Sequence, residues 1–133
     1  MKSIKKSKEK SEPTKAELEI LRVLWKLGPS TVRAVNEELN KELRQVNYTS
    51  TLKLMQIMAE KCLLKRDETN MKHIYGPLEE EHKTKSHLLE KFVNTMYNGS
   101  ASSLMMQLFG NKKPTKKEIE EIKALLNRIE KES

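Results

Sequence analysis

The sequence has very little cysteine, few aromatic residues and no long apolar run. Cys62 is the only cysteine among 133 residues, so no disulfide can form within the chain and nothing indicates an oxidising compartment. No apolar stretch approaches the ~18 residues that a membrane-spanning helix requires, and the lysine-rich start is not followed by the apolar segment of a signal peptide. We therefore expect a soluble cytoplasmic protein that is not inserted into a membrane.

The sequence also lacks the patterns of catalytic and metal sites. It contains no glycine-rich phosphate loop, and no serine, histidine and acid in series with a supporting turn motif. His82 and His87 are five residues apart, whereas two histidines that share a metal on one helix are three or four apart. Cys62 has no neighbouring base in the sequence to activate it. These absences predict that the chain is not an enzyme and uses no metal or cofactor.

Charge is what the sequence has in abundance. Charged residues make up 34% and aromatic residues 5%, a balance that favours helices with solvated faces over a β-sandwich. The net charge of +7 divides into +3 for residues 1–12, +3 for residues 13–78 and +1 for residues 79–133. This basic surplus indicates an anionic partner such as nucleic acid. Residues 1–12 are predicted to be a disordered basic tail, which either adds nonspecific attraction to phosphates or has no role.

A first helix is predicted where the basic tail ends at Pro13. Thr14 and Glu17 have the spacing of a capping box, in which the hydroxyl and the carboxylate each satisfy a free backbone amide. Apolar residues follow at helical spacing as far as Gly28-Pro29, a pair that ends a helix. Trp25, the only tryptophan, is expected to anchor the core rather than to bind a ligand.

A second helix is predicted from Thr31 to Leu43, with Ser30 as its N-cap. Arg33 lies in the first turn of this helix, where free backbone N–H groups attract an anion. Arg33 is therefore either a phosphate contact or an ordinary solvated arginine.

A third helix is predicted from Asn47 to Leu64, with two contrasting faces. Its inner side consists of Thr51, Leu54, Met55, Met58 and Cys62. Its outer side consists of Thr49, Lys53, Gln56 and Glu60, of which the first three could hydrogen-bond base edges. The alternative is an ordinary surface helix that packs on a core.

The periodicity changes after this helix. Leu63–Asp67 and His73–Tyr75 predict two short extended runs across a polar turn, which together make a β-hairpin that ends at Gly76-Pro77. Three helices followed by a hairpin form a winged helix-turn-helix. We assign this DNA-binding domain to residues 13–78, within a fold that is mainly α with one small β-hairpin.

The remaining residues, 79–133, predict a helical dimerisation domain. Helices are expected over Glu79–Asn98 and Ala101–Phe109, the second ended by Gly110, and a last helix begins at Pro114-Thr115 with a second capping box. Three helices are too few to close a core alone, so their apolar faces need a partner. A two-fold related copy covers them most simply; the alternative is packing on the same chain. The candidate dimer residues are Leu88, Leu89, Phe92, Val93, Met96, Leu104, Met105, Leu108, Phe109, Ile119, Ile122, Leu125 and Leu126.

Taken together, several segments from Pro13 onward resemble the BlaI/MecI/CopY family of transcriptional repressors. They are Thr14-Lys15-Ala16-Glu17, Ile20-Leu21, Val23-Leu24-Trp25, Gly28-Pro29-Ser30-Thr31-Val32-Arg33, Tyr48-Thr49-Ser50, Leu63-Leu64-Lys65-Arg66, Tyr75 and Pro77-Leu78. The resemblance implies a homodimeric winged-helix repressor of resistance or stress operons that binds inverted repeats in double-stranded DNA. Members of this family are often released when a membrane sensor-protease pathway triggers their cleavage.

The chain departs from the family pattern at several places, among them Leu52 and Ile57, which are apolar where the family is usually polar. It lacks the cysteine-rich C-terminal tail of copper-responsive members, which argues against copper sensing. The apolar stretch Leu104–Phe109 contains no Asn-Phe pair, the bond cut in antibiotic-responsive members, so release by cleavage would need another bond. Cys62 stands where the family commonly has glycine, at a cost of ~1 kcal/mol if the left-handed conformation is kept.

Two functions follow from this interpretation. The first is a sequence-specific DNA-binding repressor, and the second is a winged-helix adaptor for protein contacts; an activator using the same fold is a further alternative. Leu52 could touch a thymine methyl, whereas Ile57 is expected to pack. The base-edge candidates are Thr49, Ser50, Leu52, Lys53 and Gln56. The phosphate candidates are Thr31, Arg33, Tyr48, Lys65, Arg66, Lys72 and His73.

Overall fold

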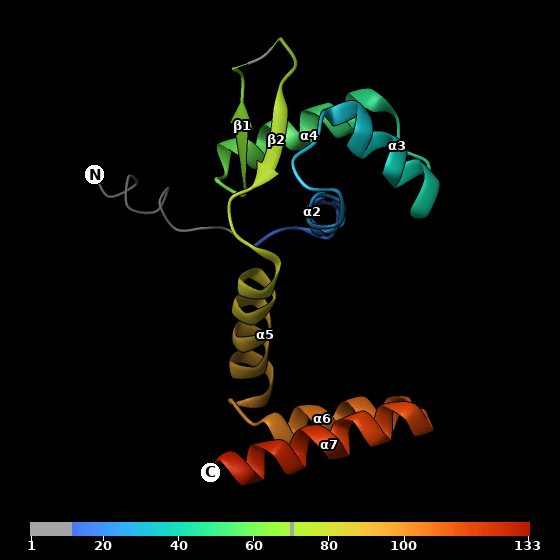
Figure 1. The fold of residues 1–133 in the computed structure, drawn as a ribbon, viewed down its shortest axis with the longest axis vertical. Helices are drawn as coiled ribbons and strands as arrows, with labels where there is room; N and C mark the ends of the chain where they lie inside the picture. The colour runs from blue at the N-terminus through green and yellow to red at the C-terminus, as the bar shows by residue number, and fades with distance from the viewer. Residues whose placement is uncertain (1–11, 70) are drawn as a thin grey trace, which may run out of the picture. The chain divides into compact units, whose positions relative to one another are not determined.

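The computed structural model describes residues 12–69 and 71–133 (Figure 1). It is mainly helical with one two-stranded antiparallel sheet, as predicted. One compact unit ends at Leu88, and a second spans Leu89–Ser133. The predicted basic tail, residues 1–12, lies outside the described residues apart from Glu12. The predicted functional boundary between residues 78 and 79 stays a prediction.

The first described helix, α2 (Lys15–Leu27), has the predicted ends. The backbone N–H of Glu17 donates to Thr14 Oγ1 at 3.2 Å, and the N–H of Thr14 donates to Glu17 Oε1 at 2.9 Å. These two bonds are the reciprocal pair of a capping box. At the other end, Gly28 has φ 85°, a conformation that glycine adopts without a Cβ clash.

Helix α3 (Val32–Glu42) begins differently from the prediction, which took Ser30 as its cap. Thr31 is the cap instead, since its side chain accepts from the Ala34 N–H at 3.1 Å. Ser30 is in an extended bridge with Tyr75, and their backbones exchange hydrogen bonds of 2.9 and 2.8 Å. Ser30 therefore joins the hairpin, a long-range pairing that local capping preferences could not reveal.

Helix α4 (Tyr48–Glu60) has the predicted Asn47 cap, but it ends before the predicted limit at Leu64. Cys62 has φ 64°, which stops the helix, and Leu64 already pairs in a strand. Cys62 is exposed, so the prediction that it lies on the buried side of the helix was wrong. The residue does keep the left-handed conformation that favours glycine.

The predicted hairpin is present as β1 (Leu64–Asp67) and β2 (Ile74–Pro77), paired antiparallel with Arg66 opposite Tyr75. Its inner residues complete the core of the first unit, which α2, α3 and α4 build. Trp25 is half-buried, packs against this core and donates from Nε1 to the Glu79 carbonyl at 3.3 Å. The core residues are Ile20, Leu21, Val23, Leu24, Val32, Val35, Leu39, Met55, Met58, Leu64 and Tyr75.

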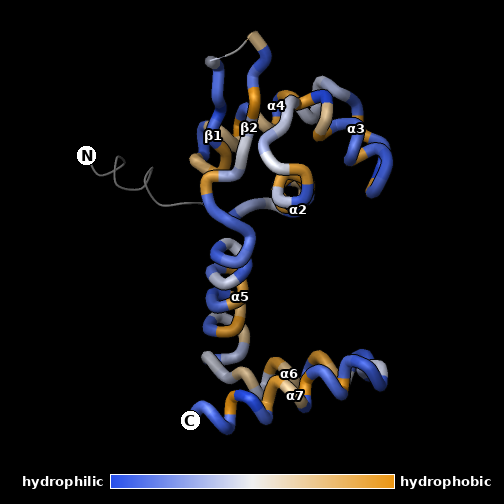
Figure 2. Tube along the Cα trace, in the orientation of Figure 1, coloured by the Kyte–Doolittle hydropathy of each residue, from blue (hydrophilic) through white to orange (hydrophobic). Residues whose placement is uncertain are grey.

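Three helices follow the hairpin: α5 (Glu81–Tyr97), α6 (Ala101–Asn111) and α7 (Lys116–Glu132). Asn98 and Gly99, both at positive φ, separate α5 from α6, and the predicted capping box of Thr115 and Glu118 starts α7. The prediction that Gly110 ends α6 was wrong, because the helix continues through Asn111. Figure 2 shows that α6 is largely apolar, whereas polar and apolar residues alternate along α7.

The described residues include no helix long and apolar enough to cross a membrane.

Candidate nucleic-acid interface

The outer face of α4 carries the polar residues that the sequence pattern placed there. Thr49, Ser50, Lys53 and Gln56 are all exposed, whereas Thr51, Met55 and Met58 on the inner face are buried. The hydroxyls, the ammonium and the amide of the outer face are the kinds of group that pair with base edges in a major groove.

Two apolar residues flank this polar face. Leu52 is half-buried and lies over a hollow beside the helix. Ile57 was predicted to pack, but its side chain is 38% exposed. One turn before it lies Lys53, so the two side chains are neighbours on the helix surface. The outer face thus offers an apolar contact as well as polar ones.

The C-terminal end of α4 is fixed by an ion pair that sequence reasoning missed. Lys61 Nζ lies 2.8 and 2.9 Å from the two carboxylate oxygens of Glu17 at the start of α2. The Glu17 side chain is only 3% exposed, and that of Lys61 is 25% exposed. Glu17 therefore caps α2 and holds the end of α4 with one carboxylate. The capping box accounted fully for Glu17 in the sequence, so no signal of this second role was left.

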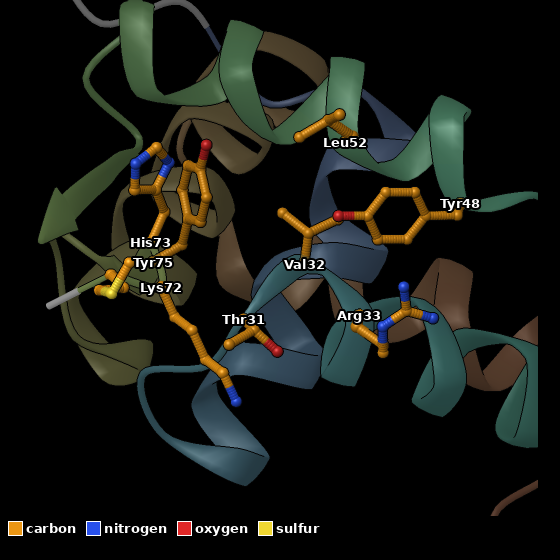
Figure 3. Close-up of a pocket in the computed structure, with 9 residues that line it drawn as sticks. Thr31, Val32, Arg33, Tyr48, Leu52, Lys72, His73 and Tyr75 are labelled. Atoms are coloured by element: carbon orange, nitrogen blue, oxygen red, sulfur yellow. The ribbon is translucent and has the colours of Figure 1, made fainter. Parts of the chain in front are cut away.

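Beside the first turn of α4 lies a hollow of about 320 Å³ that gathers five of the seven phosphate candidates (Figure 3). Figure 3 shows Leu52 above it, Arg33 and Tyr48 on one side, and Lys72 and His73 with Tyr75 on the other. The lining residues are Thr31, Val32, Arg33, Tyr48, Leu52, Met71, Lys72, His73 and Tyr75. The hollow is thus lined by the start of α3, the start of α4 and the hairpin of β1 and β2, which we term the wing.

Arg33 has a defined partner on this surface. Its guanidinium carbon lies 5.1 Å from the centre of the Tyr48 ring, within the range of a cation–π contact. Both side chains are exposed. The ring orients the guanidinium at the start of α3 without neutralising its charge, so that the charge stays available to an anion near the free amides of the helix start.

Lys65 and Arg66, the remaining phosphate candidates, lie on β1 and do not line the hollow. Arg66 Nη2 is 2.5 Å from Glu68 Oε2. Hydrogen bonding to Tyr75, followed by attraction to Glu68, raises the pKa of Arg66 above its ordinary value. Its charge is thus shared with an acid within the wing. Lys65 is exposed on the same strand, and after the hydrogen bonds from Thr69 its charge helps to lower the pKa of Asp67.

The predicted dimer residues lie on the three C-terminal helices. Leu89, Phe92 and Met96 of α5 are 56%, 47% and 63% exposed. No residue from Leu89 to Ser133 is buried, although α6 and α7 carry many apolar residues. Leu88 is half-buried and is the last residue of the first unit.

The described part of the chain can also be compared with the pattern of a metal site. No group of three or more histidine, cysteine or acidic side chains there is placed to hold a metal ion.

Comparison with known proteins is consistent with this geometry. A family profile described as penicillinase repressor matches residues 13–128. The chain is 25% identical to the penicillinase repressor of Staphylococcus aureus over 90% of this chain and 94% of that protein. It is 25% identical to the methicillin resistance regulatory protein MecI of Mammaliicoccus sciuri, over 88% and 94%. It is 28% identical to the penicillinase repressor of Bacillus licheniformis, over 84% and 86%.

Proposed function

This chain belongs to the penicillinase repressor family of DNA-binding transcriptional repressors, and from that premise we propose that it acts as a homodimer seated on an inverted-repeat operator. Repression then needs no chemistry, because a dimer that occupies a promoter excludes RNA polymerase from it. The observation that supports this proposal most directly is the polar outer face of α4 beside the cation-lined hollow.

In the proposed complex, the N-terminal part of α4 enters the major groove. Thr49, Ser50, Lys53 and Gln56 read base edges, and Leu52 contacts a thymine methyl. The exposure of the four polar side chains supports these roles, because each can reach a base without a change in the core.

The surroundings of α4 contact the phosphates in this proposal. Arg33 and Tyr48 bind one phosphate at the start of α3, with Thr31 beside them. Lys72 and His73 bind the DNA backbone from the wing. These residues line one hollow, which supports this assignment, since a single stretch of DNA backbone can contact all of them. Lys65 and Arg66 add positive charge on the other strand of the hairpin, where Arg66 also pairs with Glu68.

The C-terminal helices supply the dimer in this proposal. A stretch of 45 residues with exposed Phe92, Met96, Leu108 and Leu126 and no buried residue needs a partner to bury its apolar surface. A two-fold related copy presents the same surface to itself, so one set of residues serves both chains. Two such copies also present two recognition helices, as an inverted repeat requires.

Selection of bound sequences from a random pool of DNA duplexes tests the proposal. We expect a palindromic consensus whose half-sites are about one helical turn, or a multiple of it, apart. Affinity for that consensus should fall with salt at a log–log slope of about −0.9 per phosphate contacted. A hydrophobic adaptor would enrich no sequence and would bind its partner with little salt dependence. Reporter transcription with and without the consensus then separates a repressor from an activator.

A further inference from the structure

The linker between α3 and α4 is held by two asparagine side chains of α3. The backbone N–H of Val46 donates to Asn40 Oδ1 at 2.6 Å, and the carbonyl of Val46 accepts from Asn36 Nδ2 at 3.0 Å. Asn36 and Asn40 are one turn apart and so lie on the same side of α3. Both backbone polar groups of this one linker residue are thus bound by side chains.

Asn36 also reaches the inner face of α4. Its Nδ2 donates to Thr51 Oγ1 at 2.9 Å, and its Oδ1 accepts from Asn40 Nδ2 at 3.2 Å. Thr51 is 1% exposed and Asn36 is 8% exposed. The side chains of Asn36, Asn40 and Thr51, with the backbone of Val46, form one continuous set of hydrogen bonds, which we term the asparagine network.

The position of this network is unusual for polar residues. Asn36 lies on the buried face of α3 among Val32, Val35 and Leu39, where an amide without partners would be costly. Apolar side chains there would bury more surface, but apolar contacts are not directional and tolerate sliding. Hydrogen bonds restrict both distance and angle. The network therefore fixes one position of Val46 and Thr51 relative to α3.

We propose that Asn36 and Asn40 are positioning residues that set the register of α4 in the major groove and thereby its discrimination between sequences. This inference rests on the proposed function. Val46 is three residues before Thr49, so a shift of the linker moves the first turn of α4. Base-edge hydrogen bonds tolerate only a few tenths of an ångström, whereas attraction to phosphates acts over about 8–10 Å. A displaced α4 would lose discrimination but keep its nonspecific affinity.

The test compares the affinity of the full chain for its selected consensus with its affinity for a random duplex of equal length. Asn36→Leu removes the hydrogen bonds of Asn36 to Val46, Thr51 and Asn40, and Thr51→Val removes one hydroxyl with little change in shape. For both variants we expect the ratio of the two affinities to fall roughly tenfold or more, the size of one lost base contact. The Kd for the random duplex should change less than about twofold, because no phosphate-contacting charge is altered.

Val35→Ala is the matched control, because Val35 is fully buried on the same helix and makes no side-chain hydrogen bond. It should lower stability and leave the affinity ratio unchanged. An unchanged ratio in Thr51→Val, or an equal fall in Val35→Ala, would overturn the inference.

Hydrogen exchange provides a readout that does not depend on DNA. The amide of Val46 donates to Asn40 Oδ1, so it should lose protection in Asn40→Leu relative to Val35→Ala, and full protection in Asn40→Leu would overturn the positioning role. A wild-type chain that prefers no duplex would instead overturn the proposed function, even if the amide result is as expected.

Discussion

Three single residues in or just after α4 differ in charge, polarity and backbone strain. Lys53 is an exposed positive charge on the outer face, Ile57 is an apolar group on the same face, and Cys62 is a strained residue just beyond the helix. In the proposed complex the first two contribute to the choice of bases, and the third affects stability. Each can be changed without disturbing the buried core.

Replacing Lys53 with alanine distinguishes a contact with a base from a contact with phosphate alone. If Lys53 contacts a guanine, Lys53→Ala should weaken operator binding by about 1–3 kcal/mol and relax the preference at one base pair. Fluorescence anisotropy on the consensus and on random duplex measures both effects. An equal loss on the two duplexes would show that Lys53 contacts only phosphate.

Ile57 is expected to contact a thymine methyl, because its exposed side chain adjoins Lys53. Ile57→Ala should cost operator affinity of roughly 1 kcal/mol, about the transfer free energy of a buried methyl or methylene group. Replacement of the contacted thymine by uracil removes only the methyl and should cost a similar amount. The two changes should not add, because either one removes the same contact; additive losses would place Ile57 elsewhere.

Cys62→Gly should stabilise the fold by about 1 kcal/mol, since glycine adopts φ 64° without a Cβ penalty. Chemical denaturation of the two proteins measures the change. Asn98→Gly is the matched control at φ 50°, and its gain should be smaller, because asparagine tolerates this conformation better. A destabilised Cys62→Gly would mean that the thiol contributes contacts that outweigh the strain.

At the scale of elements, both ends of α4 are tied to other helices by polar contacts. The asparagine network fixes its beginning to α3, and Lys61 fixes its end to Glu17 of α2. Apolar contacts through Met55 and Met58 hold its middle in the core. The helix is thereby oriented as a rigid element, which suits a role in reading DNA.

Lys61→Met should lower the free energy of unfolding by about 2–3 kcal/mol. The change leaves the Glu17 carboxylate buried without its cation, and the expected loss is below the ~3–5 kcal/mol of a fully buried pair because Lys61 is partly exposed. Lys26→Met is the matched control, since Lys26 contacts Glu38 at 2.7 Å but is 57% exposed. That substitution should cost at most about 1 kcal/mol. Equal losses in the two variants would show that burial does not strengthen the Lys61 pair.

At the scale of the whole molecule, apolar surface is distributed unevenly between the two compact units. The first unit buries a core of eleven apolar residues, whereas the second buries none of its residues. Because burial of apolar surface is the main stabilising term in folding, the second unit depends on a partner far more than the first. The proposed homodimer meets that need.

Phe92→Asp should convert the dimer to monomers, because it places a charge in the apolar stripe of α5. Operator affinity should fall steeply, since each monomer then binds one half-site without its neighbour. Analytical ultracentrifugation measures the state of association. Asn94→Asp puts the same charge on the opposite side of α5 and should leave the dimer intact. A dimeric Phe92→Asp would place the interface elsewhere.

The sequence by itself determined the features that depend on neighbouring residues. Both capping boxes, the Asn47 cap and the hairpin formed as predicted, because each is decided within a few positions along the chain. The inner and outer faces of α4 followed from helical periodicity in the same way. Family membership also followed from short motifs in combination.

Only the tertiary structure decided the features that join distant residues. Ser30 pairs with Tyr75 rather than capping α3, and Glu17 binds Lys61 across 44 positions of sequence. Asn36 lies among apolar residues of α3, and its partners Val46 and Thr51 are ten and fifteen positions further along the chain. The physical reason is that a buried polar group is satisfied by whatever the fold brings within hydrogen-bonding distance, and periodicity along one element carries no information about that neighbour.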